Sequence, residues 1–165
     1  MTQPTRLLFV CLGNICRSPA GENVMNHLLQ QEGLSGRFEV DSAGTAGYHI
    51  GGPPDSRMIA AGRARGVPMK GRARQVKVDD FAEFDWIFAM DRSNYRDLEV
   101  LKKKCNAPRA KVVLFCDFCE AHTQKEVPDP YCGGPEDFEV VLDLLEDGCG
   151  AFIRKWKSGE LKYAS

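Results

Sequence analysis

Four short apolar segments, separated by turns and helix-like patterns, constrain the fold of this chain more than any other feature. They are residues 6–10, 38–43, 86–89 and 111–115. The first segment lacks the alternation of apolar and polar residues that marks a half-exposed strand, so it predicts a strand buried on both faces. The sequence therefore predicts a doubly wound α/β fold: a four-stranded parallel sheet, helices on both faces, and a ligand site beyond the carboxyl ends of the strands.

Apolar residues at helical spacing, bounded by Gly and Pro, predict the helices between these strands. We expect helices at residues 18–33, 55–65 and 91–105, a short helical turn at 79–81, and a closing helix that begins at Glu136. No repeat, linker or change of composition divides the chain. We therefore expect one domain spanning residues 1–165, with an exposed tail from residue 157 onward.

The composition is typical of a water-soluble domain: of 165 residues, 43% are hydrophobic and 27% are charged. Lys and Arg number 22 and Asp and Glu number 23, so no overall field attracts the chain to nucleic acid or to an anionic membrane. No apolar stretch approaches the roughly 18 residues of a membrane span, and no secretory signal pattern is visible. With seven cysteines, an odd number, we expect a cytoplasmic protein with reduced thiols.

The segment after the first strand, Cys11-Leu12-Gly13-Asn14-Ile15-Cys16-Arg17-Ser18-Pro19, lies between a buried strand and the start of a helix. A tight loop there directs backbone N–H groups into one concavity, and the helix dipole adds positive potential, so the loop suits phosphate. Gly13 and Asn14 tolerate left-handed backbone, and Arg17 offers a planar fork of donors to phosphate oxygens. This positive loop favours the thiolate form of Cys11, which the Ser18 hydroxyl can stabilise. The loop therefore predicts a thiolate nucleophile facing a bound phosphate.

The loop matches in full the Cys-x5-Arg-Ser signature of the low-molecular-weight protein tyrosine phosphatases, a family that essentially the whole chain resembles. The resemblance continues through residues 40–45, 73–75, 89–94 and 129–131. It implies hydrolysis of phosphotyrosine and small aryl phosphate monoesters through a phosphocysteine formed on Cys11. It also implies that no metal or other cofactor takes part, and that inorganic phosphate is both product and inhibitor.

Asp129 is the candidate general acid, which the reaction needs because expelling a phenolate is slow without a proton. It lies between Pro128 and Pro130 in the loop after the last strand. The Asp-Pro pair alone indicates only a turn, so the role of acid rests on the resemblance. In the family, this Asp protonates the leaving oxygen and then activates the water that releases phosphate.

The resemblance also assigns the residues around the nucleophile. Those that would wall the cleft are Leu12, Ile15, Tyr48 and Tyr131. Such a slot suits a planar phenyl ring, and Ile15 favours it because relatives that resemble arginine phosphatases carry a small polar residue there. In the family, a set of hydrogen-bonded residues holds the loop in shape, and the residues that match them here are Asn14, Glu22 and Ser42.

Two positions depart from the pattern of the family. Gly71 stands where animal members have a His that joins the support of the loop. Cys132 stands where many members have a second Tyr. We therefore expect altered loop rigidity and a less aromatic cleft rim.

Three further cysteines allow more than one interpretation. Cys16 matches a family cysteine that forms a protective disulfide with the nucleophile, and the alternative is a buried loop cysteine. Cys116, Cys119 and His122 have partial metal-ligand spacing, but no second cysteine pair completes four ligands. For this last group the favoured interpretation is packing, not a metal site.

Two other functions remain open at this point. An arsenate reductase of the same fold relays electrons through further cysteines, usually near residues 80–90, where this chain has none. A non-catalytic binder of phosphate or phosphopeptides has no use for both a thiolate and an acid. The resemblance further implies a monomer or a weak homodimer.

Overall fold

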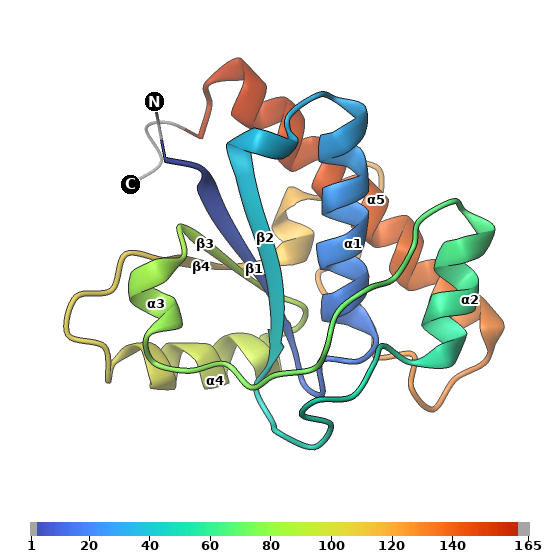
Figure 1. Ribbon diagram of the computed structural model, residues 1–165, viewed down its shortest axis with the longest axis horizontal. Coiled ribbons are helices and arrows are strands. Elements are labelled where there is room, and N and C mark those ends of the chain that lie inside the picture. The colour runs from blue at the N-terminus through green and yellow to red at the C-terminus, as the bar shows by residue number, and fades with distance from the viewer. Residues whose placement is uncertain (1–2, 162–165) are drawn as a thin grey trace.

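A four-stranded parallel sheet forms the centre of the computed structural model, which describes residues 3–161 (Figure 1). Its strands are β1 (Thr5–Cys11), β2 (Phe38–Gly44), β3 (Trp86–Ala89) and β4 (Lys111–Leu114). They pair in the order β2-β1-β3-β4, so β1 is flanked on both sides. The predicted doubly wound parallel sheet is confirmed.

Strand β1 is buried on both faces, as its unbroken apolar run predicts. Leu7 and Phe9 join the larger core cluster on one face, whereas Leu8 and Val10 join the smaller cluster on the other. All four side chains are fully buried. Because successive side chains of a strand point to opposite faces, this one strand contributes to both cores.

Helices cover both faces of the sheet (Figure 1). The larger core lies under α1 (Arg17–Gln31) and α5 (Pro135–Ser158), and the smaller core lies under α3 (Asp80–Glu83) and α4 (Arg92–Lys102). The remaining elements are α2 (Ser56–Ala64), which packs on α5, and the 3-10 turns η1 (Ser35–Arg37) and η2 (Phe115–Phe118). None of the helices within residues 3–161 is long and apolar enough to cross a bilayer.

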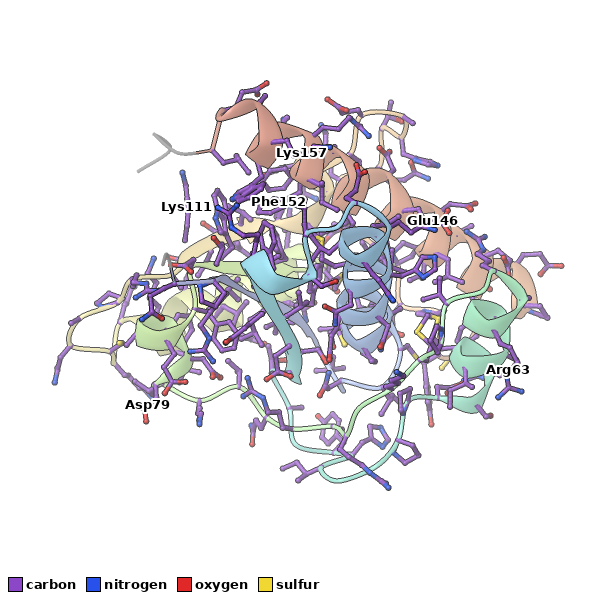
Figure 2. All side chains as sticks on the ribbon, turned by 45° about the horizontal axis from the view of Figure 1, so that its top comes forward. Arg63, Asp79, Lys111, Glu146, Phe152 and Lys157 are labelled. Atoms are coloured by element: carbon purple, nitrogen blue, oxygen red, sulfur yellow. The ribbon has the colours of Figure 1, made fainter. Side chains whose placement is uncertain are left out.

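The larger core is rich in aromatic rings. Phe152 points from α5 into the interior (Figure 2), where its ring centroid lies 5.4 Å from that of Phe88 and 5.2 Å from that of Phe118. The Phe88 and Phe152 rings are nearly perpendicular, at 89°, a favourable arrangement for aromatic pairs. These contacts fix α5 and η2 against the sheet.

Four predicted elements end earlier than expected: α1, α2, α4 and β4. The fourth strand ends at Leu114 rather than Phe115, because Phe115 turns into η2 and its ring packs 5.9 Å from that of Phe9. Gly148 permits this packing, since a Cβ there would lie 2.4 Å from the Phe115 ring. The helix α4 ends at Lys102 instead of continuing to Cys105, because the following N–H groups bond only three residues back and tighten the last turn.

The expected exposed tail is partly wrong. Lys157 and Ser158 belong to α5, which continues until Gly159 adopts a left-handed conformation (φ 84°) and ends it. Trp156 anchors this last turn, because its ring centroid lies 4.8 Å from that of Phe38. Leu161 packs against the larger core, and the rest of the predicted tail, residues 162–165, lies outside the described residues.

Candidate active site

The loop after β1 leads directly into α1, at the carboxyl edge of the sheet. The N-cap residue of α1, Cys16, makes no side-chain hydrogen bond to the first turn. Backbone N–H groups at the start of a helix lack intrahelical partners and, together with the helix dipole, favour an anion. The loop therefore has the geometry expected of a phosphate-binding site.

Asn14 adopts the left-handed conformation predicted for this loop (φ 57°), whereas Gly13 does not. Gly13 instead provides space, because a Cβ at this position would lie 3.1 Å from the His49 ring. The Asn14 side chain donates to the hydroxyls of Ser18 (2.8 Å) and Ser42 (3.0 Å). Its oxygen accepts from the backbone N–H of Arg74 (2.9 Å), so one side chain ties the loop to α1, to β2 and to the segment before α3.

Cys11 lies at the start of this loop, and the residue is only 3% exposed. Its sulfur is 3.0 Å from the Ser18 hydroxyl oxygen and accepts the backbone N–H of Asn14 at 3.3 Å. A thiolate can only accept hydrogen bonds, so in that state the Ser18 hydroxyl donates to it. Hydrogen bonds to the charged form stabilise that form.

The Arg17 guanidinium is buried near Cys11, with 3% of its side chain exposed. Its Nη1 donates to Asp91 (2.7 Å) and to the carbonyl of Val127 (3.0 Å), and its Nη2 lies 3.7 Å from a carboxylate oxygen of Asp129. Burial opposes the charge of Arg17, but the nearby Cys11, Asp91 and Asp129 outweigh it and raise the pKa of the guanidinium. Arg17 therefore stays charged and keeps one fixed orientation.

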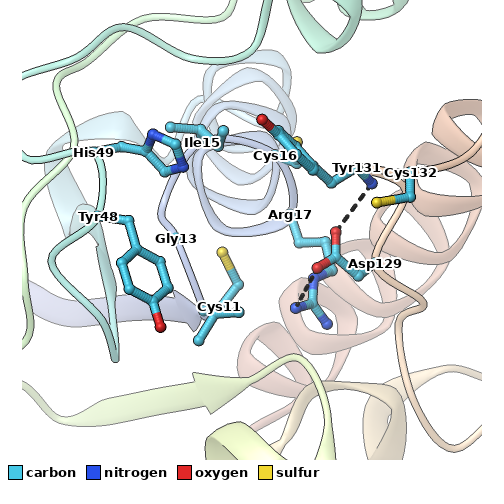
Figure 3. Close-up of a pocket in the computed structure, with 11 residues that line it drawn as sticks. Cys11, Gly13, Ile15, Cys16, Arg17, Tyr48, His49, Asp129, Tyr131 and Cys132 are labelled. Carbon is cyan, nitrogen blue, oxygen red and sulfur yellow. Dashed lines mark hydrogen bonds and ion pairs between the residues drawn. The ribbon is translucent and has the colours of Figure 1, made fainter.

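Asp129 approaches from the segment between η2 and α5, and its side chain is 47% exposed. Its Oδ1 accepts the backbone N–H of Tyr131 at 3.1 Å, while Oδ2 faces Arg17 (Figure 3). Within residues 3–161 no other hydrogen bond or ion pair holds this carboxylate, which lines the cleft. It is therefore free to exchange a proton with a bound molecule.

These residues line a cleft of about 480 Å³ (Figure 3). The cleft brings together most of the predicted site residues: Cys11, Leu12, Gly13, Ile15, Cys16, Arg17, Tyr48, Asp129 and Tyr131. Tyr48 and Tyr131 are exposed at its rim, and Cys132 lies there as well. The His49 ring lies next to both tyrosines, with ring centroids 6.5 Å and 6.4 Å away.

The remaining predicted residues lie behind the loop rather than in the cleft. The Ser42 hydroxyl donates to Glu22 at 2.6 Å and accepts from Asn14, so a continuous set of hydrogen bonds runs from Glu22 to Ser18. Burial raises the pKa of the Glu22 carboxyl to about 7, although the bond from Ser42 opposes the shift. Gly71 lies beside this network, since a Cβ on it would be 4.0 Å from a Glu22 oxygen.

A family model described as low molecular weight phosphotyrosine protein phosphatase matches residues 6–162. This chain belongs to that family. A putative low molecular weight protein-tyrosine-phosphatase of Synechocystis is 52% identical over 148 residues, covering 90% of this chain and 94% of that protein. The human low molecular weight phosphotyrosine protein phosphatase is 43% identical over 149 residues, with the same two coverages.

The solved structures agree with the family model. A protein tyrosine phosphatase from Entamoeba histolytica superimposes on this chain with a TM-score of 0.88 and 44% sequence identity. The match covers 94% of this chain and 99% of that one. The resemblance inferred from the Cys11–Ser18 signature is confirmed.

Two residues of this low-molecular-weight phosphatase site were not predicted from the sequence. Asp91 orients Arg17 with one oxygen and caps α4 with the other, which accepts the backbone N–H of Asn94 at 2.8 Å. Asp91 follows the end of β3, the strand that pairs with β1. Because the carboxyl ends of parallel strands meet at one edge of the sheet, this position could have predicted the contact of Asp91 with Arg17. His49 lies within a Gly-rich loop and carried no comparable signal.

The three other cysteines differ in their surroundings. Cys16 is buried beside the cleft, where burial, Asp55 and Cys11 raise its pKa to about 12, so it is a neutral thiol. His122 bonds to Asp147 (2.7 Å), and within residues 3–161 no group of three or more His, Cys, Asp and Glu side chains is arranged to hold a metal ion. Within these described residues, Cys116 and Cys119 therefore belong to no group of side chains that could hold a metal ion.

Proposed function

We propose that this member of the family hydrolyses phosphotyrosine and small aryl phosphate monoesters through a phosphocysteine intermediate. One observation carries the proposal: the Cys11 sulfur, the Arg17 guanidinium and the Asp129 carboxylate line the same cleft. These are the nucleophile, the phosphate-binding cation and the proton donor that phosphoryl transfer to a thiolate requires.

The reaction divides into two steps. The Cys11 thiolate attacks phosphorus while the bond from phosphorus to the phenolic oxygen breaks, and protonated Asp129 donates its proton to that oxygen. Asp129, now a carboxylate, then takes a proton from water as the water oxygen attacks phosphorus and the sulfur leaves as thiolate. Arg17 and the loop N–H groups neutralise the equatorial oxygens in both steps.

The cleft walls support an aryl substrate. Leu12 and Ile15 provide apolar surface near the phosphate loop, and Tyr48 and Tyr131 lie on opposite sides of the rim. A planar ring between them buries apolar area on both faces. Arg57 lies 5.4 Å from the Tyr131 ring centroid, a cation–π contact that orders this side of the cleft.

The residues behind the loop act as positioning residues in this proposal. Asn14, Ser42 and Glu22 hold the backbone in the shape that directs its N–H groups at phosphate. They do not line the cleft. Their removal should therefore alter the loop without removing a group that contacts the substrate.

We also propose that Cys16 protects the nucleophile. A peroxide would oxidise Cys11 to a sulfenic acid, and the Cys16 sulfur would then displace water to form a disulfide. Because Cys16 has a raised pKa and stays neutral, oxidants react first with Cys11. In a Cys16→Ser variant, activity lost to peroxide should no longer return with a thiol reductant, whereas equal recovery in both proteins would refute this role.

We further propose a compartment, an oligomeric state and binding partners for this protein. We expect one domain over residues 1–165 that works in the cytoplasm as a monomer or weak homodimer. It would need no cofactor and would bind neither nucleic acid nor membranes. Its partners would be phosphotyrosine proteins or small aryl phosphates, and inorganic phosphate would be a product and a competitive inhibitor.

The deciding experiment measures hydrolysis of an aryl phosphate at mildly acid pH, with thiol reductant and chelator present. We expect turnover by the native chain, a loss of at least about 10³-fold in Cys11→Ser, and no loss in Cys105→Ser, a control outside the cleft. Absence of turnover in the native chain would refute the proposal. A parallel assay with arsenate and a thiol reductant tests the arsenate reductase alternative.

A further inference from the structure

Two cysteines outside the cleft form a close pair that the phosphatase mechanism does not use. Cys116 lies within η2, and Cys119 directly follows it. Neither residue lines the active-site cleft. Cys116 is buried, whereas Cys119 is partly exposed.

The backbone brings the two thiols within reach of each other. The N–H of Cys119 donates to the carbonyl of Cys116 at 3.1 Å, which closes a turn of the 3-10 type. Residues joined by such a turn have Cα atoms less than about 7 Å apart, and disulfides span Cα distances of about 4.4–6.8 Å. Side chains three residues apart in a 3-10 turn lie one above the other, so the two thiols are on the same side of this turn.

The two thiols differ in exposure and in proton affinity. The hydrogen bond with Cys119 lowers the pKa of Cys116, although burial opposes the shift. The same hydrogen bond and burial raise the pKa of Cys119, whose thiol lies 3.5 Å from the backbone carbonyl of Leu144. The pair therefore keeps one proton on Cys119, the partly exposed residue, next to the buried Cys116.

The surroundings hold this turn in place. The Asp147 carboxylate of α5 accepts the backbone N–H groups of Glu120, Ala121 and His122 at 2.9–3.0 Å. The chain that follows Cys119 is thus fixed to α5 before it continues toward Val127 and Asp129. Cys149, a third thiol, is fully buried on the same helix.

We propose that Cys116 and Cys119 are a redox-active dithiol, separate from the catalytic cysteines, that closes to an intrachain disulfide by exchange with a low-molecular-weight disulfide. The inference does not depend on the phosphatase activity. Closing the pair ties down the turn from which the chain leaves the sheet toward the Asp129 segment.

The exchange takes two balanced steps. The Cys119 sulfur attacks one sulfur of the external disulfide as its proton passes to the Cys116 thiolate, forms a mixed disulfide and releases one external thiolate, which takes up a proton from water. The Cys116 sulfur then attacks the Cys119 sulfur, forms the intrachain bond and releases the second external thiol. Both protein thiols are oxidised, and the external disulfide is reduced to two thiols.

The experiment uses the full chain carrying Cys11→Ser and Cys16→Ser, so that the catalytic thiols cannot contribute. The folded protein is equilibrated in buffers with a series of ratios of reduced to oxidised glutathione. It is then alkylated and digested with trypsin, and the masses of the fragments are measured by mass spectrometry. Residues 112–125 form one tryptic fragment whose only cysteines are Cys116 and Cys119. We expect this fragment to lose both alkylation sites, to carry no glutathione and to be two hydrogens lighter than the dithiol form.

Cys105 serves as an internal control, because it is partly exposed and lies alone in the fragment 105–109. It should carry glutathione under the conditions that close the pair. Adding Cys116→Ser should leave glutathione on Cys119, since the resolving sulfur is gone. Adding Cys149→Ser should leave the disulfide unchanged.

Three results would overturn the proposal. Both sites could stay alkylated at every glutathione ratio that modifies Cys105. Glutathione could persist on Cys119 while Cys116 is intact. A disulfide could instead join fragment 112–125 to the fragment that contains Cys149.

Discussion

The two segments that meet in the cleft are held in opposite ways. In the loop after β1, Cys11, Asn14 and Cys16 are buried, and the Asn14 side chain bonds to α1, β2 and the chain near Arg74. In the other segment Asp129 is half-exposed, and within residues 3–161 its side chain has only Arg17 and its own turn as partners. The difference teaches that the candidate phosphate loop is held by many side-chain hydrogen bonds, whereas the Asp129 carboxylate is held by few and faces the cleft.

Arg17→Lys should give the largest effect, because it alters the buried side of this comparison. A lysine cannot serve Asp91, the Val127 carbonyl and a phosphate at once, since it lacks the planar fork. We expect turnover to fall by about 10²–10³-fold and the free energy of unfolding by about 2 kcal/mol. Phosphatase kinetics and urea unfolding measure both, with the exposed Arg63→Lys as control. Equal effects in the two variants would contradict the central position of Arg17.

Asp129→Asn tests the exposed side. Without a transferable proton, turnover of a substrate with a poor leaving group should fall by about 10²-fold. The free energy of unfolding should change by less than about 0.5 kcal/mol, because the side chain is half exposed.

Steady-state rates on aryl phosphates of graded leaving-group acidity check this prediction. The loss should shrink as the leaving group becomes more acidic, while Asp97→Asn, an exposed aspartate on α4, should behave like the native chain. A loss independent of the leaving group would contradict the role of acid.

Glu22→Gln should change how stability depends on pH. Burial raises the pKa of Glu22 from 4.5 to about 7, so between these values the folded protein holds a proton that the unfolded chain has released. The free energy of unfolding therefore falls as pH rises through this window and levels off above it, by up to about 3 kcal/mol from this group.

The Gln variant has no proton to lose, so its stability relative to the native chain should rise from pH 4.5 to pH 7. Urea unfolding at several pH values measures the difference. A constant difference across the window would show that Glu22 does not titrate there.

Tyr48→Ala should give the smallest effect, because this ring is 74% exposed at the rim. We expect KM for a phosphotyrosine peptide to rise about 2- to 10-fold with kcat unchanged, since the ring contributes to binding rather than to the reacting groups. Tyr131→Ala, which also removes the contact with Arg57, should raise KM more. If Tyr48→Ala raised KM more than Tyr131→Ala, the exposure of each ring would not predict its contribution to substrate binding.

The strands show how far local patterns can predict this fold. The unbroken apolar run of β1 predicted burial on both faces. Its side chains alternate between the two faces of the sheet and are all apolar, so both faces must be shielded from water. The ends of β4 and α4 were predicted less well, because the Phe115 ring turns into the core beside Gly148 and α4 closes with a tighter turn. Those boundaries depend on contacts between segments that are distant in sequence.

The amino-acid sequence by itself determined the chemistry of the phosphate loop, because Cys11, Asn14, Arg17 and Ser18 lie within one strand-loop-helix unit. Local backbone preferences are sufficient to bring them together. Only the tertiary structure decided how Arg17 is oriented, since its partners Asp91 and Val127 lie 74 and 110 residues away along the chain. The raised pKa of Glu22 likewise required the fold, because this carboxyl is buried only when the helices pack on the sheet.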